Sequence, residues 1–135
     1  MRFLTGTNIW LEILLKQERS GEAKSFLDRA EKGSVCISDF SLYSIGISFF
    51  DANQHELFLR FVEDLLVRGA VEIIRNEKAD FAQMADASKT FRLDFDDAYQ
   101  YAAAEKYNLT MVSFDSDFDR TRRGRKTPGQ ALKLK

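Results

Sequence analysis

Short runs typical of buried strands alternate with longer runs of helical spacing along this chain of 135 residues. The four strand-like runs are Met1–Thr5, Val35–Ile37, Ala70–Ile74 and Leu109–Phe114. Strands that alternate with helices form parallel sheets joined by right-handed crossovers. The pattern therefore predicts an α/β sandwich of three layers, in which helices flank a mainly parallel central sheet of four or five strands.

The intervening runs carry apolar residues at helical spacing. Six helices are predicted: from Ile9 onward, over Glu22–Lys32, Ser38–Phe50, about Glu56–Val67, Asn76 to about Lys89, and about Asp94–Tyr107. Thr7 or Asn8 is expected to cap the first helix, and Ser38 or Asp39 the third. Gly33 is expected to end the second helix, and Asn76 to cap the fifth. The chain shows no linker or repeat, so we expect one domain over residues 1–135.

The single cysteine and the lengths of the apolar runs bear on the compartment. Cys36 cannot form an intramolecular disulfide, and no metal-ligand spacing surrounds it, which favours a reducing cytoplasm. The N-terminus lacks the pattern of a signal peptide, and the apolar runs are only a few residues long. We therefore expect a cytoplasmic protein without a membrane segment.

The net charge of −1 conceals an uneven distribution. Residues 120–135 hold seven basic residues and no acid, which leaves 13 basic and 21 acidic residues elsewhere, a net charge of −8. Seven acids lie within 94–119, where Lys106 is the only basic residue. Carboxylates that gather divalent cations beside arginines that contact phosphate suit a phosphodiester partner. A solvated charged face followed by a frayed tail explains the same charges without a function, so charge alone leaves both interpretations open.

Polar and acidic residues follow three of the predicted strands. These segments are Gly6-Thr7-Asn8, Ser38-Asp39 and Asp115-Ser116-Asp117, and the first turn of the last helix adds Asp94, Asp96 and Asp97. Functional groups gather at the carboxyl ends of strands in open parallel sheets. Each acid taken singly is explained by a helix dipole or an Asx turn. Together at one edge they favour a site for Mg²⁺ or Mn²⁺, which prefer oxygen ligands.

Covalent catalysis has little support in this sequence. His55 is the sole histidine and lies among polar residues at a predicted helix start, as a surface residue would. The chain offers no second histidine and no well-placed serine or cysteine nucleophile.

Three segments stand out along the chain: Phe3–Trp10, the Asp96-Asp97-Ala98 that opens an alanine-rich helix, and Met111–Phe118. Together they resemble the PIN-domain family, and VapC-type toxins of toxin–antitoxin pairs in particular. Their order and spacing match over nearly the whole chain. The resemblance implies an endoribonuclease that depends on Mg²⁺ or Mn²⁺, forms a homodimer and is held inactive by a cognate antitoxin.

The resemblance also implies roles for individual residues. Asp97 and Asp115 match acids that hold the metal, and Asp117 lies where many members carry another acid or an amide. Asn8 and Ser113 match polar positions that support the acidic cluster. The basic cluster expected to track the RNA backbone comprises Arg120, Arg122, Arg123, Arg125 and Lys126.

The chain departs from the family pattern at two positions. Gly6 stands where members usually carry the first aspartate, and Ser44 stands where they tend to carry a glutamate, with only Asp39 nearby as a substitute. Because glycine cannot coordinate a cation, we expect a weakened metal affinity. One hypothesis is that Gly6 is an inactivating change from aspartate, selected or engineered because an unopposed toxin kills its host. The other is a naturally degenerate member that binds RNA or a partner without cutting.

Two further classes compete with the nuclease hypothesis. A non-catalytic interaction module could bind a second copy or an antitoxin peptide through the aromatic residues Trp10, Phe49, Phe50, Phe58 and Phe61. A flavodoxin-like receiver domain also gathers acids at strand ends. It is disfavoured because no acidic pair follows the first strand and no suitably placed lysine follows the last.

Overall fold

The computed structural model describes residues 1–133, and its centre is a parallel sheet of four strands. The strands are β1 (Phe3–Thr5), β2 (Val35–Ser38), β3 (Glu72–Ile74) and β4 (Thr110–Val112), in the spatial order β3-β2-β1-β4. Phe3 lies opposite both Val35 and Thr110, which sets the register of β1 against its two neighbours, β2 and β4. The predicted α/β class and parallel sheet are confirmed, and the described residues contain four strands.

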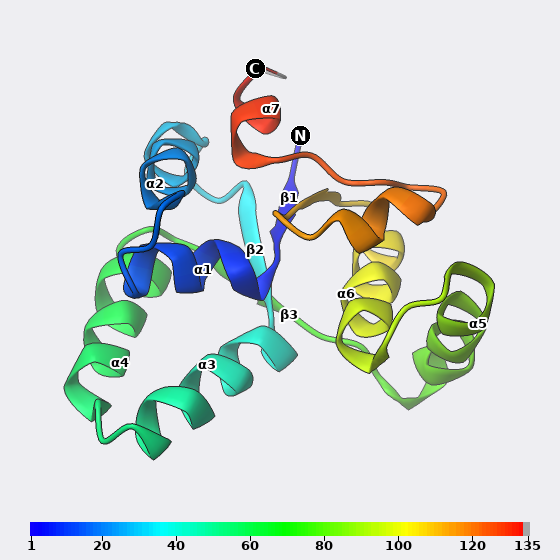
Figure 1. Cartoon of the computed structure of the whole chain (residues 1–135), viewed down its shortest axis with the longest axis horizontal. Coiled ribbons are helices and arrows are strands. Elements are labelled where there is room, and N and C mark those ends of the chain that lie inside the picture. The colour runs from blue at the N-terminus through cyan, green and yellow to red at the C-terminus, as the bar shows by residue number, and fades with distance from the viewer. Residues whose placement is uncertain (134–135) are drawn as a thin grey trace.

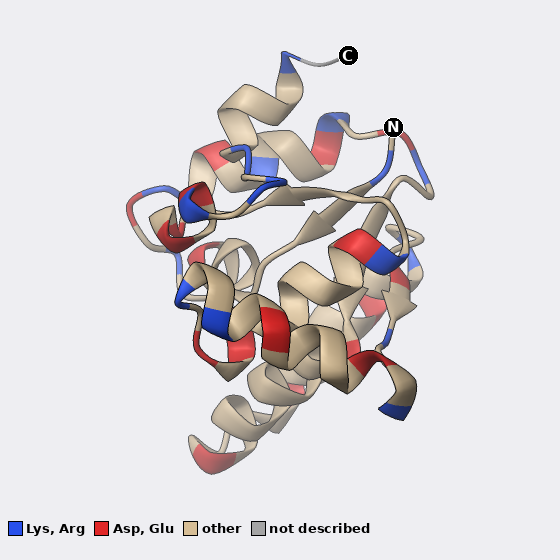
Figure 2. Ribbon diagram, turned by 90° about the vertical axis from the view of Figure 1, so that its right-hand side faces the viewer, with Lys and Arg blue, Asp and Glu red and all other residues tan. Residues whose placement is uncertain are grey.

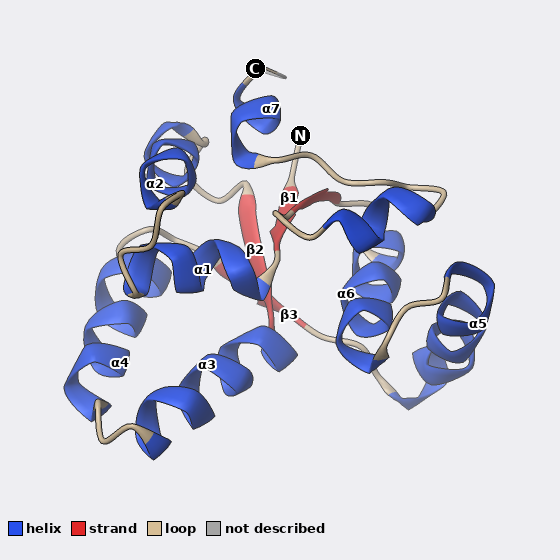
Figure 3. Cartoon of the chain, viewed as in Figure 1, coloured by secondary structure: helices blue, strands red, loops and turns tan. Residues whose placement is uncertain are grey.

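Helices cover both faces of this sheet (Figures 1 and 3). They are α1 (Thr7–Leu14), α2 (Ser20–Arg29), α3 (Asp39–Asp51), α4 (His55–Phe61), α5 (Phe81–Phe91), α6 (Phe95–Lys106) and α7 (Pro128–Leu132). In Figure 1, α1 to α4 lie to the left of the strands, whereas α6 lies to the right and separates the sheet from α5. The chain thus has the expected three layers.

Alternating strand residues contribute side chains to two hydrophobic cores, because successive side chains of a strand point to opposite faces of the sheet. Phe3 and Ile37 belong to the core beneath α1 to α4. Leu4 and Cys36 belong to the core beneath α6, whose alanines allow the helix to approach the sheet closely. Of the aromatic residues expected at an interaction surface, the structure buries Trp10, Phe49 and Phe61 in the first core and exposes half of Phe50. Phe58 is partly buried against the same core.

Ser38 accepts a hydrogen bond from the Ser41 amide and caps α3, as predicted. The predicted cap of α1 is wrong: the helix begins at Thr7, and Gly6 is its N-cap. Asn8 is therefore free to contact another strand end. Asn76 also fails to cap a helix, because its side chain is buried and donates to the Tyr99 carbonyl.

Other helix ends differ from the predicted ones. The second helix ends at Arg29, before Gly33, because Ala30 is already extended. A capping box between Glu77 and Asp80 opens a 3₁₀ turn, Lys78–Asp80, that leads into α5. The fourth predicted helix divides into α4 and a π-helical segment, Val62–Val67.

The basic segment packs against the body of the protein instead of forming a frayed tail. Thr127 and Gln130 cap α7 reciprocally. The Gly129 amide donates to the Glu22 carboxylate of α2 at 2.9 Å. Lys135, the last basic residue of the segment, lies outside the described residues. None of the described helices has both the length and the apolar character that crossing a membrane requires.

Candidate metal centre

Three carboxylates converge at the carboxyl edge of the sheet. Asp97 comes from the first turn of α6, and Asp115 and Asp117 follow β4. One oxygen from each side chain lies within 4.8 Å of the others. Asp97 is buried, whereas Asp115 and Asp117 are partly exposed. The structure thus brings together the three acids that the sequence singled out for catalysis.

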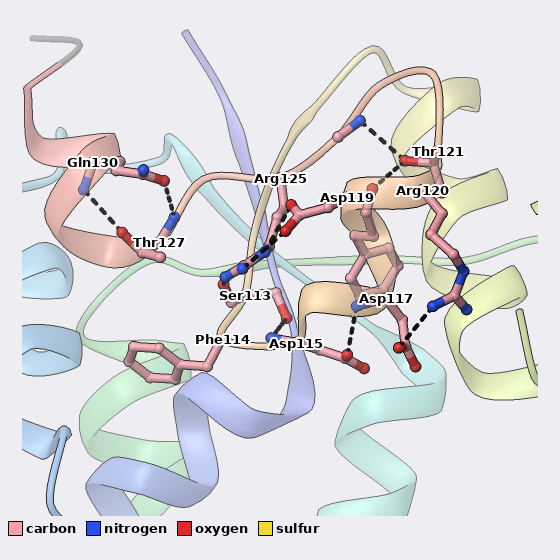
Figure 4. Close-up of polar contacts among 12 residues, drawn as sticks. Ser113, Phe114, Asp115, Asp117, Asp119, Arg120, Thr121, Arg125, Thr127 and Gln130 are labelled. Atoms are coloured by element: carbon pink, nitrogen blue, oxygen red, sulfur yellow. Dashed lines mark hydrogen bonds and ion pairs between the residues drawn. The ribbon is translucent and has the colours of Figure 1, made fainter.

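Local hydrogen bonds fix the chain segments that carry these acids. Asp94 caps α6 by accepting a hydrogen bond from the Asp97 amide at 2.9 Å, so Asp97 begins the helix in a defined place. The Asp117 amide donates to Asp115 at 2.9 Å and opens the 3₁₀ helix η3 (Ser116–Arg120) (Figure 4). Phe114 points to the opposite side from Asp115 and Asp117 (Figure 4). Both acidic segments therefore present their carboxylates to the same edge.

Asn8 joins the end of β1 to the end of β4. Its amide nitrogen donates to the Ser113 hydroxyl at 3.0 Å, and its oxygen accepts from the Phe114 amide at 3.1 Å. Ser113 in turn accepts a hydrogen bond from the Asp115 amide at 3.0 Å. Asn8 and Ser113 thus hold the main chain at Phe114 and Asp115, and their supporting role in a metal site stays a prediction.

Replacing Asn8 with alanine is expected to destabilise the chain by about 1–2 kcal/mol. The change removes two side-chain hydrogen bonds and leaves the Phe114 amide without its partner. Urea denaturation measures the loss, and alanine at exposed Ser25 of α2 serves as a control that should change stability little. An Asn8→Ala chain as stable as its parent would show that the two Asn8 side-chain hydrogen bonds contribute nothing to stability.

The carboxylates of the cluster repel one another. Burial and, after it, the nearby carboxylates of Asp115, Asp94, Asp96 and Asp117 together raise the pKa of Asp97 to about 7. Burial also raises the pKa of Asp96. Carboxylates that repel each other in this way gain from a shared positive ion.

The donor set fits a hard divalent cation. All three side chains offer carboxylate oxygens, and neither histidine nor cysteine belongs to the cluster. Mg²⁺ and Mn²⁺ bind such oxygens and complete their coordination with water or substrate phosphate. Asp97, Asp115 and Asp117 are the residues that would hold the ion.

Gly6 lies beside Ser113 and Asn8, which hold the end of β4. A Cβ at residue 6 would stand 3.3 Å from the Ser113 hydroxyl oxygen and 3.7 Å from the Asn8 side-chain oxygen. The backbone at Gly6 is extended, with φ −69° and ψ 160°, a conformation that every residue adopts. The fold therefore does not require glycine here, and a side chain would enter the supporting layer of the site.

Ser44 is partly buried on α3, and the nearby polar network uses other residues. Buried Ser41 is its centre: the Thr7 hydroxyl lies 2.7 Å away, and the Gln100 amide donates to Ser41 at 2.6 Å. Asp39, the expected substitute for the missing glutamate, instead accepts a hydrogen bond from the Tyr99 hydroxyl at 2.6 Å. Burial and this bond raise the pKa of Tyr99 to about 12.

Sequence reasoning did not single out Gln100 and Ser41. The available signal was Gln100 itself, a polar residue one turn after Asp96 on a helix whose other buried positions, apart from Asp97, are alanine and tyrosine. The Gln100 amide also lies 3.4 Å from the Asp96 carboxylate, which links the hydroxyl network to the acidic edge.

The five basic residues expected to bind RNA divide into two groups. Arg120, Arg123 and Arg125 donate to acceptors within the protein, including Asp117, Asn108 and Asp119 respectively. Arg122 and Lys126 are exposed, and within residues 1–133 their side chains make no hydrogen bond or ion pair. Acidic and basic segments are interspersed over this side of the molecule (Figure 2). The charged halves of the sequence are therefore mixed in space.

The comparisons with known proteins point to one fold. A family model described as "PIN domain" matches residues 5–124. A toxin–antitoxin complex from Klebsiella pneumoniae superposes with a TM-score of 0.72 at 20% identity, covering 93% of this chain and 97% of that chain. FitAcB from Neisseria gonorrhoeae superposes with a TM-score of 0.73 at 20% identity, covering the same shares of the two chains. VapC20 from Mycobacterium tuberculosis, a sarcin–ricin loop cleaving toxin, superposes with a TM-score of 0.71 at 18% identity, covering 87% of this chain and 92% of that chain. No curated protein matches the sequence.

Proposed function

This chain belongs to the PIN domain family, and we propose on that basis that it is a metal-dependent endoribonuclease of the toxin type, acting in the cytoplasm. The observation that carries the proposal is the convergence of Asp97, Asp115 and Asp117 at the carboxyl edge of the sheet. Similar folds in a toxin–antitoxin complex and in a sarcin–ricin loop cleaving toxin support it.

In the proposed reaction, water hydrolyses an RNA phosphodiester bond. Asp97, Asp115 and Asp117 would hold Mg²⁺ or Mn²⁺, which supplies an activated water and stabilises charge on the leaving oxygen. Asn8 and Ser113 hold the end of β4, so the two acids that follow it keep their place beside α6. Because catalysis of this kind depends on geometry, these contacts contribute through positioning.

The missing carboxylate at Gly6 favours a second candidate, a degenerate PIN module that binds RNA or a partner without cutting. Cleavage of a panel of structured RNAs with Mn²⁺, by the parent chain and by a Gly6→Asp variant, separates the two. Cleavage by either protein supports the nuclease. RNA binding without cleavage by both supports the binding module.

Exposed basic side chains of the segment that follows the acids would contact the RNA backbone. Arg122 and Lys126 are the candidates, because the other three guanidinium groups already donate within the protein. Replacing both with glutamine is expected to weaken RNA binding and to reduce the slope of log affinity against log salt by about 1–2. Titrations at several salt concentrations measure this slope.

A matched pair of charges controls for the loss of net charge. Lys32 and Arg68 precede β2 and β3, and therefore lie toward the amino edge of the sheet, opposite the acids. Their double glutamine variant should retain the parent slope. Equal slopes for the parent and the Arg122/Lys126 variant would exclude these side chains from RNA binding.

We also propose an antitoxin partner and a homodimer. A groove of about 460 Å³ between α1, α2 and α4 has an apolar floor. Three basic residues, Lys16, Lys24 and Arg60, and one acid, Asp64, line it, and this excess of positive charge suits an acidic amphipathic segment of an antitoxin. The exposed side chains of Tyr43 and Ile47 on α3 suit contact with a second copy. Light scattering with and without an acidic amphipathic peptide tests both assemblies.

A further inference from the structure

Arg120, at the end of η3, makes three contacts that join two separate parts of the molecule. Its guanidinium donates to the Asp117 carboxylate at 3.0 Å, a contact drawn in Figure 4. It also donates to the main-chain carbonyls of Phe91 at 3.0 Å and Arg92 at 2.6 Å. One side chain thus ties a carboxylate of the candidate metal centre to the end of α5.

The two carbonyls are suitable anchors because of how α5 ends. Phe91 is the last residue of the helix, and the carbonyls of a last helical turn lack partners within the helix. Arg92 adopts the left-handed conformation, with φ 57°, that commonly terminates a helix. A guanidinium at this end also interacts favourably with the helix dipole. Arg120 is therefore held by fixed main-chain atoms.

We propose that Arg120 is a positioning residue for the metal centre, acting through Asp117. The inference rests on the proposed cation site of the nuclease. Arg120 donates its hydrogen bond to Oδ1 of Asp117, which leaves Oδ2 available for an ion. The Asp117 side chain is nearly half exposed, and this hydrogen bond keeps its carboxylate in one orientation beside Asp97 and Asp115. The sequence had indicated an RNA contact for Arg120, whereas its contacts place it behind a metal-binding carboxylate.

Two effects of Arg120 on cation binding oppose each other. Its positive charge repels a cation, but the Arg120 and Asp117 side chains are 32% and 46% exposed, so water and salt screen this repulsion. Its hydrogen bond orients a ligand, and loss of such an outer partner typically costs about 10–100-fold in metal affinity. Orientation is the larger effect, so removing Arg120 should weaken cation binding.

The test is Mn²⁺ affinity, measured by isothermal titration calorimetry on the whole folded chain. Arg120→Gln is expected to weaken Mn²⁺ binding about 10-fold or more, and Arg120→Lys to recover part of the loss. Arg123→Gln is the matched control, because Arg123 likewise donates to a main-chain carbonyl, that of Leu109, but contacts no acid of the cluster. It should bind Mn²⁺ within about twofold of the parent.

A double-mutant cycle with Asp117→Asn separates positioning from a general structural effect. If Arg120 acts through Asp117, then Arg120→Gln weakens Mn²⁺ binding no further once Asp117 has been replaced. Equal losses in both backgrounds would overturn the inference, as would undiminished affinity in Arg120→Gln alone. Failure of every variant, including Gly6→Asp, to bind Mn²⁺ would overturn the proposed metal centre itself. Binding by the parent with no effect of Arg120 would leave that centre in place.

Discussion

Replacing Gly6 with aspartate is expected to increase Mn²⁺-dependent RNA cleavage by about 100-fold or more. The variant would add a carboxylate at the carboxyl end of β1, the edge of the sheet where Asp97, Asp115 and Asp117 converge. Loss of an outer hydrogen-bonding partner of a metal ligand already costs about 10–100-fold, so a direct ligand should contribute at least as much. Cleavage of a panel of structured RNAs, at matched protein and Mn²⁺ concentrations, measures the gain.

The fold accommodates this aspartate at little cost. The extended backbone at residue 6 suits any side chain. Its Cβ would stand 3.3 Å from the Ser113 hydroxyl oxygen, so the Ser113 side chain must shift by a few tenths of an ångström. The residue is the N-cap of α1, and aspartate is among the best residues for that position. The variant should therefore be at least as stable as its parent with Mn²⁺ present.

Alanine at position 6 is the matched control. It introduces the same Cβ beside Ser113 but no ligand, so cleavage should stay at the parent level. An equal gain in RNA cleavage by the aspartate and alanine variants would show that the effect comes from packing of the Cβ against Ser113. An aspartate variant no more active than the parent would contradict the hypothesis that Gly6 is an inactivating change.

The strand ends explain why the sequence predicted the acidic cluster. Parallel strands deliver their carboxyl ends to one edge, so Asp115 and Asp117 after β4 had to meet the residues that follow β1. Asp97 joined them because α6 precedes β4 and begins at that edge. These inferences need only the order of elements and the direction of strands, both of which hydrophobic periodicity contains.

The contacts of the basic segment could not be predicted in the same way. Arg120 reaches carbonyls at Phe91 and Arg92, 29 and 28 residues earlier in the chain. Such partners depend on where α5 ends, and helix ends are the least certain part of a sequence-based prediction. The network around Ser41 and Gln100 has the same character, since its members are 59 residues apart.

Replacing Asp97 with asparagine is expected to stabilise the cation-free chain at pH 8 while abolishing cleavage. Asparagine keeps the shape of the side chain but removes its charge from a buried position among four other carboxylates. One pKa unit corresponds to about 1.4 kcal/mol, and the partly exposed Asp115 and Asp117 open the cluster to water. We therefore expect a gain of about 1–2 kcal/mol, less than the full shift would imply.

The gain should depend on pH in a defined direction. The pKa of Asp97 rises from its ordinary value of 3.8 to about 7 in the folded chain. The folded state therefore retains a proton that the unfolded chain releases near pH 4. The stability conferred by that proton is fully present below pH 4 and is lost as the pH rises toward about 7. Asparagine should thus stabilise the chain at pH 8 and have little effect below pH 4.

Mn²⁺ is expected to reverse the ranking of the two proteins, because an ion stabilises only a chain that binds it. Thermal unfolding at pH 8 should show the parent gaining stability with Mn²⁺ and Asp97→Asn gaining none. Asparagine at exposed Asp86 of α5 removes one negative charge outside the cluster and should leave both behaviours unchanged. An Asp97→Asn chain that is less stable than the parent without Mn²⁺ at pH 8 would show that the carboxylate is favourably solvated where it stands. The cluster would then lack the repulsion that a bound cation is expected to relieve.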